Sequence, residues 1–282
     1  MTHRHYSLNL PLGALMGCCL LAGLGGPSAA ADIMVRSDGA DIRSGPWFMR
    51  VTALADDILR VRAVAAPDLP EDASWAVPGE MRGRSIHVSI KQTIDGVDFK
   101  TAALAVRIER SPLRLIVTDL AGHVISSDTP TRAIDMVGSG FTLRKVLAQT
   151  EHFFGLGDKT GPLDRRGQAF TLWNTDAYHF QESTDPLYKS IPFFVAAGGP
   201  GGSYGILLDN TWRSWFDFGK QDPQTLAFGA AAGPIDYYLI YGPSVHRVVE
   251  RYTDLTGKPP LVPAWPRSSS AARRSRCCSR SW

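Results

Sequence analysis

The chain has 282 residues, of which 44% are hydrophobic and 10% are aromatic. This composition excludes a disordered chain and is sufficient for the core of one large domain. The formal net charge is +3, but Arg4 and five arginines in the last sixteen residues account for six of the 30 basic residues. The rest of the chain has 24 basic and 27 acidic residues. This balance indicates no nucleic-acid partner.

The first 31 residues have the pattern of an export signal. Arg4 is followed by an uncharged, largely apolar stretch at residues 10–26 and by small residues at positions 28–31, as in a secretory signal peptide. We expect a cleaved signal peptide over residues 1–31, a secreted or periplasmic protein, and no other membrane contact. Glycines and prolines make the stretch a poor membrane anchor, whereas residues 15–18 resemble a lipobox and leave a lipid anchor at Cys18 as an alternative.

The residues between 32 and 242 alternate apolar and polar side chains with the period of a β-strand. An apolar side chain stands at every second position in residues 86–90, 104–109 and 113–117, which predicts half-buried strands. Residues 204–208 and 235–241 are nearly all apolar, which favours strands in an inner sheet. Turn residues recur at short intervals without intervening helices. We therefore predict an all-β fold, an antiparallel β-sandwich over residues 32–242.

The body of the chain lacks the residues of a metal, disulfide or nucleotide site. All four cysteines lie outside residues 20–276, and the scattered histidines form no ligand motif. Gly155 and Gly157 begin a glycine pattern, but Thr160 stands where the third glycine of a dinucleotide fingerprint would be. We expect no metal and no cofactor, and we interpret these glycines as part of a hairpin.

One helix is predicted after the last strand. Ser244 is a candidate N-cap, and apolar residues follow at helical spacing as far as Tyr252. Gly257 suits the position after the last turn, and two prolines beyond it stop the helix. We interpret residues 243–265 as a connector helix and linker that leave the sandwich.

The best candidates for a binding function lie between residues 151 and 217. Aromatic residues are interleaved there with Asp, Asn and Lys, a mixture that suits a sugar, because its ring faces stack on aromatics and its hydroxyls bond polar groups. Asp176 stands between polar residues, so that sugar binding and a turn-forming role are both open. Trp173, Trp212 and Trp215 are interpreted as packing residues first, with stacking on a ligand as the alternative.

Five sequence blocks over residues 154–260 resemble the amino-terminal domain of family 31 glycoside hydrolases of the α-glucosidase type. They read FGLGDKTGPLDRRG, LWNTDAY, DPLYKSIPFF, YGILLDNTWRSWFDFG, and IDYYLIYGPS with VVERYTDLTGKPP. The resemblance implies a mutarotase-like β-sandwich packed against a (β/α)8 barrel that holds both catalytic aspartates. It also implies that a loop of the sandwich reaches the mouth of the active site, where Asp176 contacts hydroxyls of the bound sugar.

The resemblance also implies which function to expect. With both catalytic carboxylates on the barrel, we expect no catalytic residue here and a chain that is inactive alone. Asp176, Trp173 and Lys189 are the expected substrate-binding residues for an α-glucoside or oligosaccharide. One alternative is a free-standing carbohydrate-binding module that uses the same three residues. Another is an aldose mutarotase, whose His/Glu acid–base pair would have to come from positions 151, 152, 179 and 182.

The last seventeen residues are unlike the rest of the chain. Residues 266–282 are rich in Arg, Ser and Cys and have no periodicity. The resemblance implies a barrel strand just after Trp265, so we interpret this tail as aberrant, the product of a frameshift or a misplaced gene end. A basic nucleic-acid-binding tail is the alternative.

Overall fold

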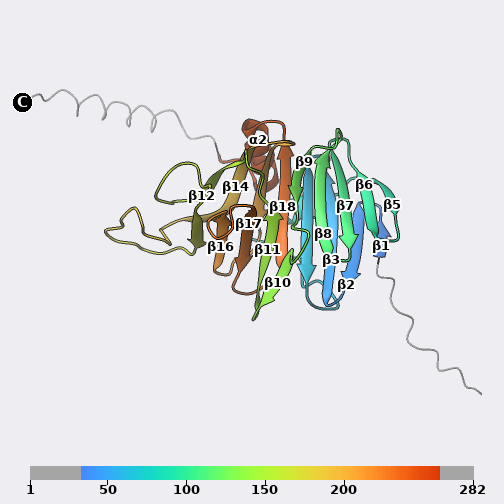
Figure 1. Ribbon diagram of the computed structural model, residues 1–282, viewed down its shortest axis with the longest axis horizontal. Coiled ribbons are helices and arrows are strands. Elements are labelled where there is room, and N and C mark those ends of the chain that lie inside the picture. Colours follow the sequence, from blue (N-terminus) through green and yellow to red (C-terminus); the bar gives the residue numbers. More distant parts are fainter. Residues whose placement is uncertain (1–32, 261–282) are drawn as a thin grey trace, which may run out of the picture. The chain divides into compact units, whose positions relative to one another are not determined.

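The computed structural model describes residues 33–260 (Figure 1). The expected signal peptide at residues 1–31, the alternative lipid anchor at Cys18, the end of the linker and the tail at residues 266–282 lie outside this part. Within it the strands form three antiparallel sheets. No helix of the described residues is long and apolar enough to cross a membrane.

The largest sheet, sheet A, has eight strands and joins both ends of the described chain. Their order is β1 (Ile33–Arg36), β2 (Gly39–Ser44), β3 (Trp47–Ala55), β4 (Ile58–Val64), β18 (Ile235–Gly242), β15 (Gly202–Leu208), β14 (Ser190–Gly199) and β12 (His152–Gly157). The order places the last strand, β18, in the middle of the sheet beside β4.

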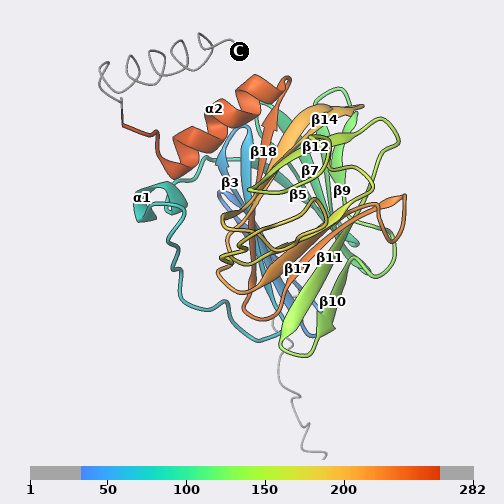
Figure 2. The same cartoon turned by 90° about the vertical axis from the view of Figure 1, so that its left-hand side faces the viewer.

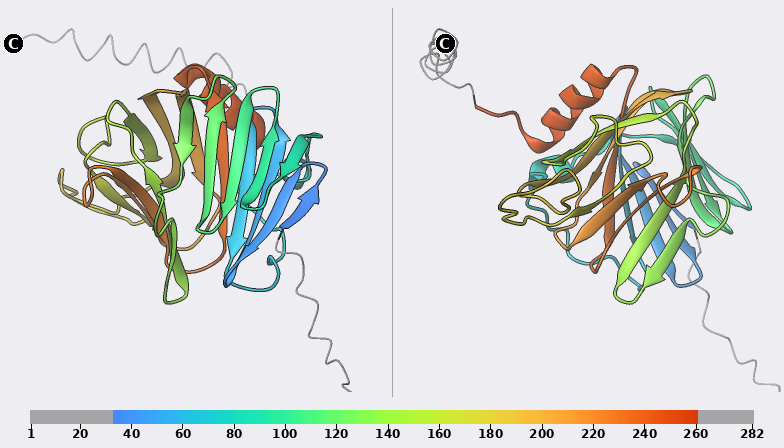
Figure 3. Two further views of the ribbon diagram at one scale, coloured as in Figure 1. Left: turned by 45° about the vertical axis from the view of Figure 1, so that its right-hand side comes forward. Right: turned by 60° about the vertical axis from the view of Figure 1, so that its left-hand side comes forward.

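Two five-stranded sheets face sheet A. Sheet B has the order β5 (Ser89–Gln92), β6 (Gly96–Lys100), β7 (Leu104–Arg110), β8 (Leu113–Asp119) and β9 (Val124–Ser127). Sheet C has the order β10 (Ile134–Val137), β11 (Gly140–Val146), β17 (Thr225–Ala230), β16 (Ser214–Phe218) and β13 (Ala169–Leu172). An isolated bridge between Asp128 and Lys145 links the two sheets, which together form the second layer of the sandwich (Figure 3).

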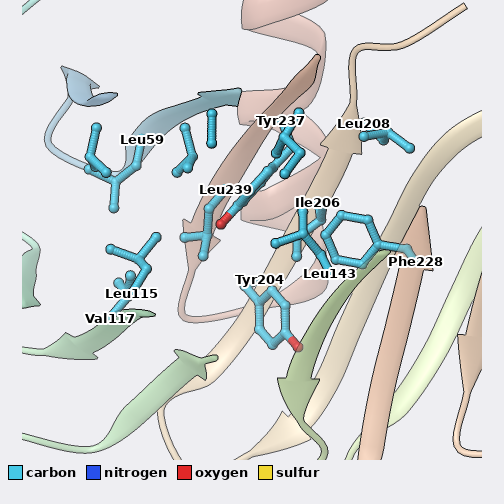
Figure 4. Packing of buried hydrophobic residues seen from close by; sticks show 14 of the residues in the cluster. Leu59, Leu115, Val117, Leu143, Tyr204, Ile206, Leu208, Phe228, Tyr237 and Leu239 are labelled. Carbon is cyan, nitrogen blue, oxygen red and sulfur yellow. The ribbon is translucent and has the colours of Figure 1, made fainter. Parts of the chain in front are cut away.

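The main core lies between the two layers. Leu59 of sheet A, Leu115 of sheet B and Leu143 of sheet C are each at most 1% exposed and belong to one cluster of buried apolar side chains. Figure 4 shows these three residues with Phe228 and Leu239 in this interior. The predicted all-β sandwich is therefore confirmed.

The predicted strands at residues 104–109 and 113–117 are present as β7 and β8, with alternating burial along each. The strand predicted at residues 86–90 is placed wrongly, because β5 begins only at Ser89. The N–H groups of Ile86 and Val88 bond carbonyl groups of Ala53 and Ser37. This segment alternates because it crosses from sheet A to sheet B with one side buried.

The predicted helix is present as α2 (Val245–Thr256), on the outer face of sheet A (Figure 2). Ser244 is its N-cap, since its hydroxyl accepts a hydrogen bond from a backbone N–H of the first turn at 3.3 Å. Tyr252 stacks on Phe193 of β14 at a centroid distance of 3.8 Å. Because α2 covers the outer side, β15 and β18 are buried on both faces, which explains their continuous apolar sequences. A second helix, α1 (Gly79–Arg82), is a single turn.

The glycines at positions 155 and 157 form a bulge in β12. The register with β14 shifts between Gly155 and Gly157, and both have positive φ angles, +129° and +80°. A Cβ at Gly155 would lie 2.6 Å from the carbonyl oxygen of Phe193. Close strand approach therefore accounts for these glycines. The hairpin interpretation is wrong, because the bulge lies inside β12, and its partner β14 is not the next strand in the chain.

Candidate functional site

A long loop projects from the sandwich between β13 and β14 (Figure 1). Residues 173–189, here called the arm, contain no strand or helix. The arm carries several exposed aromatic side chains, among them Tyr178, which is 82% exposed, and Phe180, which is 52% exposed. Large apolar side chains in water are the common sign of a surface made for contact.

The base of the arm is held by a buried cation. The side chain of Lys159 is 1% exposed, and its Nζ donates to the carbonyl of Thr171 at 2.5 Å and to Asp185 Oδ1 at 3.0 Å. Asp185 Oδ2 accepts a hydrogen bond from the Thr171 N–H at 2.5 Å. Nearby, Asn174 Oδ1 accepts from the N–H of Ser190 at 2.8 Å. The two ends of the arm are therefore tied together, which limits the freedom of the residues between them.

Asp176 lies on the arm and is exposed. Within residues 33–260 no group donates a hydrogen bond to its carboxylate and no cation pairs with it. The turn-forming interpretation therefore has no support in the structure. A carboxylate that faces water without a protein partner is free to accept hydrogen bonds from a ligand.

Lys189, at the other end of the arm, is also exposed. Its Nζ lies 3.8 Å from Asp158 Oδ1, and its side chain is 65% exposed. An ion pair of this length in water contributes little. Neither Lys189 nor Asp176 lines the cavity at the base of the arm, so the structure does not gather the three expected binding residues in one pocket.

Trp173 does line that cavity, which has a volume of about 440 Å³. Two more tryptophans border it, Trp75 from the segment before α1 and Trp212 from the loop after β15. Trp75 is 97% exposed, Trp173 49% and Trp212 57%. The packing interpretation is thus wrong for Trp173 and Trp212. Trp173 directly follows β13, and Trp212 lies in the loop between β15 and β16, so both rings lie outside the sheets and miss the core.

The polar part of the cavity was not recognised in the sequence. Asp209, Ser190 and Asn174 lie on its wall. Burial raises the pKa of Asp209, and the nearby guanidinium groups of Arg60 and Arg82 oppose that rise. Asp209 stands directly after β15, and a strand end beside Asn and Trp residues is the only signal that the sequence offers for it.

The candidates for a mutarotase acid–base pair do not come together. Glu151 is 4% exposed and accepts a hydrogen bond from the Ala148 N–H at 2.9 Å. His152, its neighbour on β12, has an exposed side chain whose Nδ1 lies 2.6 Å from Asp164 Oδ2. The Glu151 carboxylate is thus buried against the backbone, whereas the His152 ring is exposed beside Asp164, so the two groups are not presented together to a substrate. His179 and Glu182 both lie exposed on the arm, and no hydrogen bond or ion pair joins their side chains within residues 33–260.

The fold and its exposed arm define a mutarotase-like sandwich of the kind that accompanies glycoside hydrolases. Residues 48–217 match the family described as the glycosyl hydrolase 31 N-terminal galactose mutarotase-like domain. The chain therefore belongs to glycoside hydrolase family 31, as its sequence blocks indicate.

Known relatives agree with this assignment. Alpha-glucosidase 2 of Bacillus thermoamyloliquefaciens is 34% identical over 226 residues, which are 77% of this chain and 27% of that protein. An alpha-glucosidase of Saccharolobus solfataricus is 34% identical over 128 residues, 45% of this chain and 18% of that protein. The chain thus spans about a quarter or less of the length of these curated relatives.

A solved structure has the same architecture and 30% sequence identity to this chain. The Flavobacterium johnsoniae family 31 dextranase, complexed with isomaltotriose in one structure and with glucose in another, superposes with a TM-score of 0.75 at 30% identity. The match covers 83% of this chain and 28% of the dextranase. An alpha-xylosidase from a soil metagenome, at 16% identity and a TM-score of 0.68, shares the fold.

Proposed function

We propose that this sandwich contributes the arm and Asp176 to the mouth of a saccharide-binding active site of the α-glucosidase type. The observation that carries the proposal is the free carboxylate of Asp176 on an arm tied at its base by Lys159 and Asp185. Tying the base lowers the entropy lost when the arm meets a sugar. The names of the relatives, which include two alpha-glucosidases, favour α-glucosides as the substrate class.

On this proposal the described residues bind sugar and do not cleave it. Retaining hydrolysis requires two carboxyl groups about 5–5.5 Å apart across the scissile bond. In family 31 enzymes of this type, the resemblance assigns both to the barrel. Purified chain should therefore release no chromophore from a nitrophenyl α-glucoside. Hydrolysis of the nitrophenyl α-glucoside by the chain itself, after contaminating glucosidases have been excluded by active-site titration, would contradict the proposal.

A chimera tests the role of Asp176. Residues 32–260 would replace the matching part of the Bacillus alpha-glucosidase that the chain resembles. Loss of one charged hydrogen bond to the sugar should make Asp176→Asn lower kcat/KM for maltose by about tenfold to a hundredfold. Asp68→Asn is the matched control, because the Asp68 side chain is 91% exposed. Its only ion pair within the described residues is a long one, 3.9 Å from Oδ1 to a guanidinium nitrogen of Arg43. Equal kcat/KM for the two variants would rule out the role of Asp176.

The second candidate function is a free-standing carbohydrate-binding module that uses Asp176, Trp173 and Lys189. The exposed ring of Trp173 at the rim of a cavity favours it, because tryptophan faces are common partners of sugar rings. Calorimetric titration of the chain with maltose tests it, and we expect millimolar affinity, a free energy of about −4 kcal/mol.

We also propose export, for which the signal-like composition of residues 1–31 is the support. Expression in a bacterium followed by amino-terminal sequencing of the periplasmic protein tests the proposal. A mature chain that begins near residue 31 or 32 is expected. Full-length protein confined to the cytoplasm would contradict export, and a lipid on Cys18 would favour the anchor.

A further inference from the structure

Two residues of the wall of the cavity at the base of the arm each carry a buried polar atom without a partner. Asp209 Oδ2 and Ser190 Oγ make no hydrogen bond within the described residues, and the two residues belong to the cavity lining. A buried polar atom that lacks a hydrogen bond costs about 1–3 kcal/mol. Native proteins leave few such atoms, and the exceptions commonly mark the place of a ligand or water.

The aromatic wall of the cavity is assembled from three distant segments. Trp75, Trp173 and Trp212 border the same space although they are far apart in the chain, and each is about half exposed or more. Together the three tryptophans form an exposed apolar surface around one cavity. A ligand that covers this surface gains the free energy of removing it from water.

The loop that carries Trp212 is held by hydrogen bonds of Asn210. Asn210 Oδ1 accepts a hydrogen bond from the Trp212 N–H at 2.8 Å, and Asn210 Nδ2 donates to the carbonyls of Ala232 and Pro234 at 3.0 and 3.2 Å. Gly233 stands directly behind the ring, since a Cβ there would lie 3.0 Å from Trp212 Cδ1. The ring is therefore placed before any ligand arrives, which favours binding.

The charges near the cavity select a neutral ligand. Arg60 is held by two carboxylates, Asp236 and Asp72, each through two hydrogen bonds of 2.7–3.0 Å. Arg82 also bonds Asp72, at 3.0 Å. These guanidinium groups are thus already paired with carboxylates, and their positive charge offsets the negative charge of Asp209, so the cavity favours neither sign of ligand charge. A neutral molecule rich in hydroxyl groups suits such a wall.

We propose that this cavity is a carbohydrate site of the sandwich itself, which takes one or two pyranose units of a neutral saccharide. Sugar hydroxyls bond polar groups of the wall, to which Asp209 and Asn174 belong, and an apolar ring face lies on Trp212 or Trp173. The cavity volume of about 440 Å³ falls within the range of small-molecule sites. This site goes beyond the proposed function, because it needs neither Asp176 nor any group outside residues 33–260.

Calorimetric titration of the full chain with maltose and isomaltose tests the cavity. Wild type is expected to bind one of these sugars in the millimolar range, and Trp212→Ala and Asp209→Asn should each weaken binding by about tenfold or more. Asp68→Asn should bind like wild type. Thermal unfolding and circular dichroism verify that the variants are folded. Asp209→Asn changes no shape and Trp212 is exposed, so both are expected to fold.

Three results would overturn the proposal. The first is no binding of either sugar by the folded wild type. The second is unchanged binding by both cavity variants. The third is loss of binding in Asp176→Asn with retention in Asp209→Asn, which would place the sugar on the arm. In that last case the proposed function survives, because the chimera tests Asp176 independently.

Discussion

Lys145 Nζ lies 2.7 Å from Asp128 Oδ1 in the interior of the sandwich, and both side chains are 1% exposed. Asp128 follows sheet B, Lys145 belongs to β11 of sheet C, and the Lys145 ammonium also donates to the Tyr237 hydroxyl of β18 in sheet A at 3.3 Å. Asp128 Oδ2 accepts from the Leu115 N–H at 2.7 Å. One ion pair therefore connects all three sheets. Burial alone would lower the pKa of Lys145, but the Asp128 carboxylate raises it well above its usual value.

Removal of one partner of this pair should be costly. Lys145→Met leaves the Asp128 carboxylate buried without its cation, and we expect a loss of about 3–5 kcal/mol in the free energy of unfolding. The double variant Asp128→Asn with Lys145→Met removes both charges and should lose less than the single variant. Urea unfolding followed by fluorescence measures both. If the double variant is less stable than Lys145→Met, the unpaired Asp128 carboxylate is not the cause of the stability loss in Lys145→Met.

The stability of the fold should depend on the ionisation of Asp72 in acid. Hydrogen bonds from Arg60 lower the pKa of Asp72 to about 2, from the usual 3.8, although burial opposes the shift. A lowered carboxyl pKa adds stability above the unfolded value and loses it as the pH falls toward the folded value. Because the side chain is 43% exposed, solvent screening reduces the contribution to about 1 kcal/mol.

The variant Asp72→Asn should therefore be less stable than wild type at pH 7 and pH 5, and the difference should shrink at pH 3. Urea unfolding at these values measures it, with Asp68→Asn as the exposed control. A difference that stays constant from pH 7 to pH 3 would disprove the linkage to Asp72 ionisation.

The arm should loosen when its base is untied. Asp185→Asn removes the anionic partner of the buried Lys159 ammonium, and we expect a cost of about 1–3 kcal/mol. Amide hydrogen exchange over residues 173–189 should become faster. Asp176→Asn is the control within the same arm, and its stability should change by less than about 0.5 kcal/mol. Equal exchange rates in both variants would show that Asp185 does not hold the arm.

Helix α2 should depend on the absence of a side chain at position 205. A Cβ at Gly205 would lie 2.6 Å from Phe193 Cε2 and 2.9 Å from Val248 Cγ1, so Gly205→Ala must displace one of them. We expect a loss of about 1–3 kcal/mol from overpacking. The stack of Phe193 on Tyr252 should change too, and near-ultraviolet circular dichroism reports on it. Gly83→Ala, where the nearest atom is 3.4 Å away, should leave both measurements unchanged.

Local patterns were sufficient for the elements that are regular along the chain. Alternation predicted β7 and β8, and the N-cap at Ser244 predicted the start of α2. The same alternation placed a strand over residues 86–88, where main-chain hydrogen bonds go to Ala53 and Ser37. Alternation of apolar and polar residues indicates which side of a segment is buried. It does not indicate which strand the backbone bonds.

The candidate site was less accessible to sequence reasoning. The mixture of aromatic and polar residues pointed to Trp173, which does line the cavity. Trp75 lies in a separate segment with no pattern of its own, and only the folded chain brings it beside Trp212. Lys189 was expected to bind substrate with Asp176 and Trp173, but its Nζ lies beside Asp158, and it does not line the cavity. Assembly from distant segments leaves no local trace in a sequence.

The pairing of β4 with β18 sets the order in which the domain can be completed. Leu59 pairs with Leu239, 180 positions later. During synthesis β4 emerges from the ribosome long before its partner, with one edge unpaired and apolar faces uncovered. Such an edge invites wrong pairing, and contacts of this sequence separation form slowly. The edge of β4 therefore stays open to wrong partners until residue 242 has emerged and β18 enters the middle of the sheet.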